Sequence, residues 1–263
     1  MNSIIRFIVC MCLSLTLLAF TLPNPPQATI YLIGDSTVCD QPTDRYPVTG
    51  WGTPFANYFD ATVKVDNRAK GGRSTRTFLE ENRWQPIVES LKPGDYVLMQ
   101  FGHNDEAKEP QYAARYTPVP DYKKNLIKFI IETRSKNAVP ILITPVSRRV
   151  FKNDQAQQTH VEYTAAVFEI GKQYNVPVID LDKKSRELYQ QMGTDNSKLL
   201  FMELEAGEHP IYPEGRHDNT HFNDYGARIM AQFVLNDIKA QNLPLSQLIV
   251  KGQNKPAVNP QAK

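Results

Sequence analysis

The sequence is poor in cysteine and carries almost no excess charge. Its 263 residues include 3 cysteines, of which Cys10 and Cys12 lie near the start and only Cys39 lies further along. A single cysteine in the folded part allows no intramolecular disulfide, so the stability has to come from a hydrophobic core. The 30 basic and 28 acidic residues leave a formal charge of +2. This balance gives no electrostatic reason to expect a nucleic acid as partner.

Several motifs of common enzyme sites are also missing. Ser36 has no glycine two residues later, so the Gly-x-Ser-x-Gly elbow of another hydrolase fold is absent. Gly50-Trp51-Gly52 lacks the third glycine of a dinucleotide-binding loop. No combination of Cys and His pairs has the spacing of a zinc site, so we expect no metal and no organic cofactor. One alternative remains, in which a metal is gathered by His209, His217 and His221 with Glu214 and Asp218.

The N-terminal segment has the pattern of an export signal. Arg6 is followed by a mostly apolar run over residues 7–20, which is shorter than the roughly 20 residues that span a bilayer. We predict a signal peptide over residues 1–28, with cleavage near Ala28 and a periplasmic or extracellular product that has no stable membrane span. The alternative is an N-terminal anchor or a buried helix. Residues 251–263 are rich in Lys, Gln, Asn and Pro, which predicts a poorly ordered tail.

Between these ends, residues 29–250 alternate between short apolar runs and segments with helical periodicity. The pattern predicts helices after Asp121, over 159–174, and from about Asn223. The apolar runs lack polar alternation, as strands buried on both faces do. We therefore predict one three-layer α/β/α domain with a five-stranded parallel, doubly wound, flavodoxin-like sheet. Its strands are expected over 29–33, 62–65, 96–101, 139–144 and 176–181.

Polar clusters follow the first four predicted strands. In an open parallel sheet, ligands bind beyond the carboxyl ends of the strands, so these clusters should meet at one edge. They are Gly34-Asp35-Ser36-Thr37, residues 67–74, Gly102-His103-Asn104-Asp105 and residues 144–149. The long irregular stretches 39–50 and 196–220 are expected to add loops to the same site.

Ser36 is the candidate nucleophile, because a serine at a strand-to-helix turn exposes both its hydroxyl and its backbone N–H. It needs a base, and the base needs an orienting carboxylate. Of the five histidines, only His221 has an aspartate, Asp218, three residues earlier in a loop before a predicted helix. His217 adjoins Asp218 directly, but neighbouring side chains generally point apart. We expect Cys39 to be a small buried residue rather than a second nucleophile.

Four spaced blocks, Gly34-Asp35-Ser36, Gly72, Gly102-His103-Asn104-Asp105 and Asp218-x-x-His221, resemble the ordered blocks of the SGNH (GDSL-like) hydrolase superfamily. The resemblance implies Ser36 as nucleophile, His221 as general base and then acid, and Asp218 as its orienting partner. It also implies an oxyanion hole made of the Ser36 and Gly72 N–H groups and the Asn104 side-chain amide. The Gly71-Gly72 doublet leaves a one-residue ambiguity, and we favour Gly72 because it directly precedes Arg73-Ser74.

In finer detail, the sequence resembles the rhamnogalacturonan acetylesterases in four places: Gly34-Asp35-Ser36-Thr37, Gly50-Trp51-Gly52, Asn67-Arg68-Ala69 leading into Gly72-Arg73-Ser74-Thr75-Arg76-Thr77-Phe78, and Gly102-His103-Asn104-Asp105. This resemblance implies a serine esterase that removes acetyl groups from an acetylated acidic polysaccharide or oligosaccharide of pectin through an acyl-enzyme. Arginine forks suit sugar carboxylates and an aromatic face suits a sugar ring. The candidate substrate contacts are Trp51, Arg73, Arg76, His103 and Arg148, with Arg149 beside them. Each also has a structural interpretation, in a local ion pair for an arginine or in the core for Trp51.

Two other functions stay open at this point. One is an SGNH esterase of different specificity, namely a xylan or peptidoglycan deacetylase, a lysophospholipase or a thioesterase. The predicted loops contain no long apolar lid, which argues against long acyl chains. The other is a carbohydrate-binding protein with a relic triad, although a relic has no reason to keep Ser36, Asp218, His221, Gly72 and Asn104 together.

Overall fold

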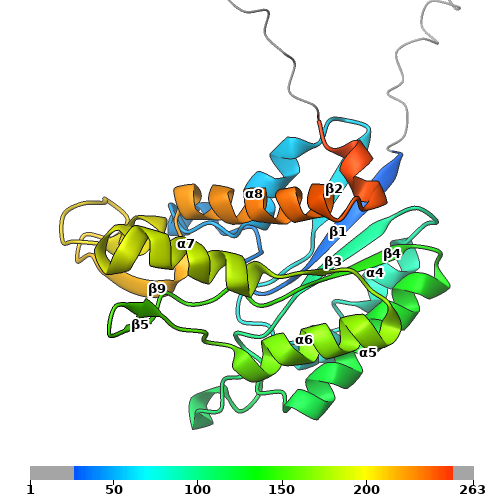
Figure 1. Ribbon diagram of the computed structural model, residues 1–263, viewed down its shortest axis with the longest axis horizontal. Helices are drawn as coiled ribbons and strands as arrows, with labels where there is room; N and C mark the ends of the chain where they lie inside the picture. The colour runs from blue at the N-terminus through cyan, green and yellow to red at the C-terminus, as the bar shows by residue number, and fades with distance from the viewer. Residues whose placement is uncertain (1–26, 251–263) are drawn as a thin grey trace, which may run out of the picture.

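The computed structural model describes residues 27–250, so the predicted signal peptide and C-terminal tail lie outside the described residues apart from Gln27 and Ala28 (Figure 1). The sheet is parallel throughout and its strands are in the order β2-β1-β3-β4-β7. The predicted α/β fold is therefore confirmed. The five strands are β1 (Ala28–Gly34), β2 (Val63–Asn67), β3 (Tyr96–Gln100), β4 (Val139–Ile143) and β7 (Val178–Ile179).

The ends of the sheet differ from the prediction in two places. Ala28, which the prediction placed in the signal peptide, is buried in β1 and pairs with Val63. The last strand is much shorter than the predicted 176–181, because the side chain of Asp180 accepts a hydrogen bond from the Lys183 N–H and so caps a helix that begins at Leu181.

The longest helices are α5 (Val119–Ser135), α6 (Val161–Tyr174), α7 (Leu181–Asn196) and α8 (Asp224–Ala240). The helix predicted from about Asn223 is confirmed as α8, and Asn223 caps it through a hydrogen bond from the Gly226 N–H. The start predicted for α5, after Asp121, is wrong, because Pro118 precedes the first helical residue and Asp121 lies in the first turn. Helix α7 was not predicted. Three shorter helices are α2 (Gly52–Phe55), α3 (Thr75–Glu80) and α4 (Gln85–Ser90).

The helices cover both faces of the sheet, which explains the missing polar alternation (Figure 1). Ile30 and Leu32 of β1 belong to one buried cluster, which includes residues of α2, α7 and α8. Tyr31 and Ile33, on the opposite face, belong to a second cluster with residues of α3, α4, α5 and α6. The strands are therefore fixed between two cores, and their carboxyl ends form a rigid edge.

Two small antiparallel hairpins extend beyond that edge. They consist of β5 (Phe151–Lys152) with β6 (Gln155–Ala156), and β8 (Phe201–Leu204) with β9 (Arg216–Phe222). The second hairpin corrects the prediction of an irregular loop over 196–220.

Among residues 27–250, no helix is both long and apolar enough to cross a bilayer. Short 3-10 helices are η1 (Thr43–Arg45), η2 (Ala56–Tyr58), η3 (Pro110–Tyr112), η4 (Ser197–Leu200) and η5 (Pro244–Leu248).

Candidate active site

Ser36 lies in the tight turn that follows β1. The buried carboxylate of Asp35 accepts hydrogen bonds from the Thr37 N–H at 2.9 Å and from the Thr37 hydroxyl at 2.8 Å. The Asp35 carbonyl also accepts the N–H groups of Val38 and Cys39, at 3.2 and 3.0 Å. These bonds on both sides of Ser36 fix the turn and direct its hydroxyl into the cleft.

Trp51 supports this turn from inside the protein. Its indole N–H donates to the Gln100 side chain at 2.8 Å, and the amide of Gln100 donates to the Thr37 hydroxyl at 2.6 Å. The prediction that Trp51 offers a face to a sugar ring is wrong, since its side chain is 1% exposed and packs edge-on against Phe55.

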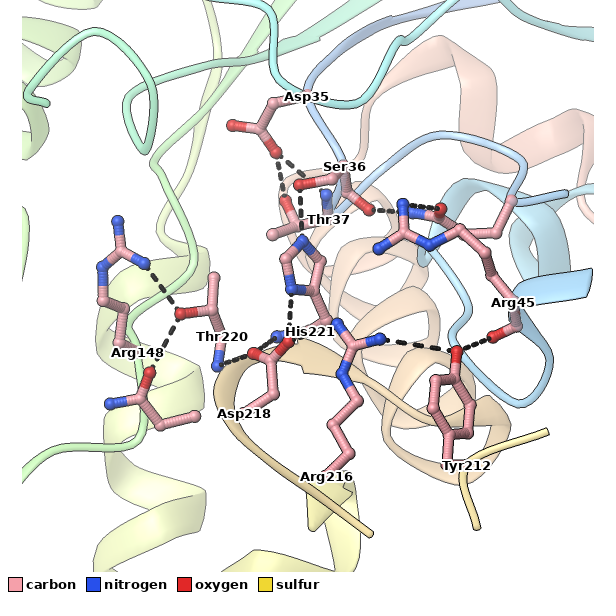
Figure 2. A network of polar contacts seen from close by, with 12 residues as sticks. Asp35, Ser36, Thr37, Arg45, Arg148, Tyr212, Arg216, Asp218, Thr220 and His221 are labelled. Atoms are coloured by element: carbon pink, nitrogen blue, oxygen red, sulfur yellow. Dashed lines mark hydrogen bonds and ion pairs between the residues drawn. The ribbon is translucent and has the colours of Figure 1, made fainter. Parts of the chain in front are cut away.

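Figure 2 shows a continuous chain of contacts from Ser36 to Asp218. Nε2 of His221 lies 2.9 Å from the Ser36 hydroxyl oxygen, and Nδ1 lies 2.8 Å from Oδ2 of Asp218. The structure therefore brings together the three residues that were predicted as nucleophile, base and orienting carboxylate, from opposite ends of the chain. The competing His217 is exposed and contacts Glu203 instead, at 3.0 Å.

A break in the β8–β9 pairing lets Asp218 and His221 face the same site. Met202 pairs with Asp218 while its neighbour Phe201 pairs with Phe222, so the residues between 218 and 222 bulge out of the ladder. Oδ1 of Asp218 accepts the N–H groups of Thr220 and His221, each at 2.9 Å, which leaves Oδ2 for the imidazole. In a regular strand, residues three apart point to opposite faces.

Asp218 is held in its charged form. Burial alone raises the pKa of its carboxyl, but hydrogen bonds and charge from His221, together with a hydrogen bond from Arg216, outweigh burial and lower that pKa overall. Nη2 of Arg216 lies 2.6 Å from Oδ2, the same oxygen that contacts the imidazole. A permanently charged Asp218 favours the tautomer of His221 whose Nε2 can accept the serine proton.

The three residues predicted to form the oxyanion hole, Ser36, Gly72 and Asn104, all line the same cleft. Neither the Ser36 N–H nor the Gly72 N–H donates a hydrogen bond among the residues that the structure describes. Gly72 has φ +79°, a left-handed conformation that favours glycine and brings its backbone into the cleft. The Gly71 N–H instead lies against the sulfur of Cys39, which favours Gly72 as the donor of the doublet.

Asn104 also lines the cleft, with its amide fixed in orientation. One N–H of its Nδ2 donates to the Arg73 carbonyl at 3.0 Å, which leaves the second N–H free to face a ligand. Cys39 lies nearby but is no rival nucleophile, because burial raises the pKa of its thiol to about 11.

The other predicted substrate contacts divide into two groups. His103 and Arg148 line the cleft. Burial and the positive charges around it lower the pKa of His103 well below its usual value, so the ring is neutral. Arg73 and Arg76 do not line the cleft and pair with Glu81 and Glu80. The predicted contact of these two arginines with substrate therefore has no support from the cleft.

Arg148 and Arg149 hold the bulge of β9 in place. The Arg148 guanidinium donates to the Thr220 hydroxyl at 2.7 Å (Figure 2). The Arg149 N–H donates to the Asn219 carbonyl at 2.8 Å, and its guanidinium pairs with Glu203 at 3.1 Å. Both arginines therefore position the Asp218–His221 segment, whatever contact Arg148 also makes with a ligand.

The cleft has a volume of about 680 Å³ and includes residues that the sequence analysis missed. Arg45 belongs to the irregular stretch 39–50, which was expected to build the site. Tyr112 and Arg115 lie between β3 and α5, where no motif marked them. An isolated arginine gives no spacing signal, so only the fold could place Arg115 in the cleft. Within residues 27–250, no group of three or more His, Cys, Asp or Glu side chains is arranged to hold a metal ion.

The sequence matches the model of the GDSL-like Lipase/Acylhydrolase family over residues 32–229. The chain belongs to that family. It is similar to rhamnogalacturonan acetylesterase RhgT of Bacillus subtilis (strain 168), with 41% identity over 86% of this chain and 96% of the relative. A rhamnogalacturonan acetylesterase of Emericella nidulans is 25% identical, over 88% of this chain and 92% of the relative. The GDSL-like chain described here is a carboxylic ester hydrolase.

Solved structures agree with this family membership. The crystal structure of YxiM from Bacillus subtilis superposes with a TM-score of 0.71 at 27% identity, and the alignment covers 84% of this chain and 58% of YxiM. Axe2, an acetylxylan esterase from Geobacillus stearothermophilus, has a TM-score of 0.61 at 18% identity. The alignment covers 82% of this chain and 96% of Axe2. The second similarity supports the fold alone.

Proposed function

We propose that this GDSL-like chain is an exported serine esterase that removes acetyl groups from rhamnogalacturonan, an acidic backbone of pectin, through an acyl-enzyme. The observation that carries the proposal is the contact chain Ser36–His221–Asp218, with distances of 2.9 and 2.8 Å. The substrate is taken from RhgT, a rhamnogalacturonan acetylesterase by name, whose identity of 41% extends over most of both chains.

In the first step of the proposed reaction, the Ser36 hydroxyl attacks the acetyl carbonyl carbon and gives its proton to Nε2 of His221. The tetrahedral intermediate then expels the sugar oxygen, which takes that proton and leaves as a free hydroxyl. In the second step, His221 takes a proton from water as the water attacks the acetyl-serine. Acetate leaves, and Ser36 recovers its proton from His221.

Charge develops on the carbonyl oxygen in both steps, and the three predicted donors that line the cleft are suited to it. The Ser36 and Gly72 N–H groups and the Asn104 amide are neutral, so they stabilise an oxyanion without repelling the proton that His221 holds. A preorganised donor of this type contributes about 3 kcal/mol to the transition state.

Acetate release from three substrates tests the proposal. The substrates are acetylated rhamnogalacturonan, acetylated xylan and a small acetyl ester, each incubated with the purified protein and with Ser36→Ala. We expect acetylated rhamnogalacturonan to be deacetylated faster than acetylated xylan. Ser36→Ala should release no acetate from any of the three substrates. Release only from the small ester would keep the hydrolase and contradict the pectic substrate, while faster release from xylan would favour a xylan deacetylase.

Export is part of the proposal and rests on the apolar run over residues 7–20. Because Ala28 lies in β1 and the Gln27 N–H bonds the Thr62 carbonyl at 2.7 Å, we place the cleavage before Gln27. The N-terminus of protein collected from the periplasm or the medium checks this. A chain that stays in the cytoplasm with Met1 or Asn2 at its start would contradict export.

A further inference from the structure

The cleft contains one arginine that the protein leaves unused. Among the arginines that the structure describes, Arg115 alone makes neither an ion pair nor a side-chain hydrogen bond. Its Nε is buried and has no partner within residues 27–250. A guanidinium presents its N–H donors in a planar fork that matches a carboxylate, so the two terminal nitrogens of Arg115 remain available to bind an anion.

Arg115 is nevertheless held in place. Its guanidinium carbon lies 3.8 Å from the centroid of the Tyr112 ring, a cation–π contact. The Arg115 N–H donates to the Tyr112 carbonyl at 2.9 Å, which fixes the turn that stacks the two side chains. The Thr117 N–H donates to the Asp105 carbonyl at 2.9 Å and closes the loop at its base. A preorganised cation loses little entropy when a ligand binds.

The position of Arg115 relates it directly to the ester site. Nη1 lies 3.8 Å from where a methyl group on Gly72 would be, and Gly72 is a proposed oxyanion donor. Ser36, Gly72 and Arg115 all line the same cleft. A group bound by Arg115 would therefore belong to the acetylated sugar or to its neighbour in the chain.

The other charged groups of the cleft leave Arg115 without an acidic partner. Of the acidic residues, Asp40 bonds Thr53 and Asn67, Glu106 contacts Arg148 and His160, and Asp218 pairs with Arg216. Only Glu109 has no ion pair or hydrogen bond from the residues that the structure describes. Of the basic residues, Arg45, Lys70 and Arg115 line the cleft without an acidic partner.

We propose that Arg115, stacked on Tyr112, binds the carboxylate of a uronic acid residue next to the acetylated hydroxyl and thereby selects acidic over neutral glycans. This inference rests on the proposed function and adds the residue that recognises its substrate class. A neutral glycan such as xylan has no carboxylate for the guanidinium fork to bind, whereas every galacturonate residue carries one.

A binding experiment tests Arg115 without depending on turnover. The ligands are a deacetylated galacturonate-containing oligosaccharide and the same oligosaccharide with its carboxyl groups reduced to alcohols, measured by calorimetry. We expect the unmodified protein to bind the acidic form about tenfold more tightly or better, and Arg115→Gln to lose that preference. Arg115→Lys should restore part of it. Arg83→Gln, a matched change at an arginine that pairs with Glu81 and does not line the cleft, should keep the full preference.

A kinetic arm separates this inference from the proposed function. The ratio of kcat/KM on acetylated rhamnogalacturonan to kcat/KM on a small acetyl ester should fall about tenfold or more in Arg115→Gln, mainly through KM. If the unmodified protein releases no acetate from the polymer, the proposed function fails while the binding arm still decides the role of Arg115. An acidic preference that persists in Arg115→Gln would overturn the inference. The inference would also be overturned if Arg115→Gln lost as much affinity for free acetate as for the acidic oligosaccharide, because Arg115 would then bind the product.

Discussion

The guanidinium of Arg216 and the imidazole of His221 contact the same oxygen of Asp218, at 2.6 and 2.8 Å (Figure 2). Arg216 therefore places a permanent positive charge beside the base. It also extends to Tyr212, whose hydroxyl donates to the Arg45 carbonyl at 2.8 Å. Asp218 is thus linked to the loop that precedes β9 and to η1, as well as to His221.

Replacement of Arg216 should change the pH dependence of catalysis. Without this cation, a protonated His221 is repelled less, so Arg216→Gln should move the acid limb of the kcat/KM profile to higher pH by about half a unit to one unit. Asp35 and His103 also interact electrostatically with His221, and both remain in the variant. Tyr212→Phe keeps the charge and serves as the control. An acid limb that does not move in Arg216→Gln would show that the guanidinium has no electrostatic effect on the base.

Removal of the Asn104 amide should slow turnover without unfolding the protein. Asn104→Ala deletes one neutral donor, and we expect kcat to fall by about 10²-fold or more. Asn125 provides a matched control, because its amide donates to Thr75 outside the cleft and Asn125→Ala should leave turnover close to the original. Thermal melting of both variants checks their folding. An Asn104→Ala protein with full turnover would remove this residue from the oxyanion hole.

The thiol of Cys39 should be inert although it lies close to Ser36. Burial raises its pKa to about 11, so almost no thiolate exists at pH 8. We expect iodoacetamide to leave Cys39 unmodified in the folded protein and to modify it after denaturation, as peptide mass mapping would show. Cys39→Ser should keep its esterase activity. Rapid alkylation of the folded protein, with loss of activity, would contradict the assignment of Ser36 as the single nucleophile.

The grouping of Ser36, Asp218 and His221 could be predicted because each of these residues lies in a local sequence pattern. Ser36 follows the end of a strand, and Asp218 precedes His221 by three residues. One local motif therefore marks the serine, and a second marks the aspartate and the histidine. The fold class followed from apolar runs without polar alternation, which the two buried faces of β1 explain.

The remaining features depend on tertiary contacts that leave no local pattern. The conformation of the Asp218–His221 segment was taken for a loop, whereas it is a bulged strand whose shape depends on Arg148 and Arg149. Trp51 was predicted as a sugar platform because an aromatic face suits a sugar ring, yet its indole N–H bonds Gln100, which lies 49 positions away in the sequence. Arg115 carries no signal of its own, and its stacking on Tyr112 places it in the cleft.

Stability should depend on the buried carboxyl of Asp105. Burial raises its pKa to about 7 despite hydrogen bonds from Thr75, so the folded protein retains a proton that the unfolded chain releases above a pH of about 4. This group therefore stabilises the fold fully at low pH and loses that contribution as the pH rises to 7. Asp35, whose pKa burial also raises, acts in the same direction. His103 acts in the opposite one, since its lowered pKa costs stability below about pH 6.5.

The variant Asp105→Asn separates these contributions, because it removes one titration and leaves Asp35 and His103 unchanged. Thermal melting of both proteins between pH 4 and 8 gives the difference in their melting temperatures. We expect the original protein to lose more stability than the variant between pH 4 and 7. Parallel curves over that range would mean that Asp105 does not hold a proton in the folded state.

The most direct test of the account is to trap the acyl-enzyme during turnover of acetylated rhamnogalacturonan. The reaction is quenched in acid within the steady state, and the peptide that contains Ser36 is analysed by mass spectrometry. We expect one added acetyl group on Ser36 in the original protein, and neither acetyl-enzyme nor acetate release in Ser36→Ala. Acetate release by Ser36→Ala at an undiminished rate, or an acetyl group on another residue, would contradict it.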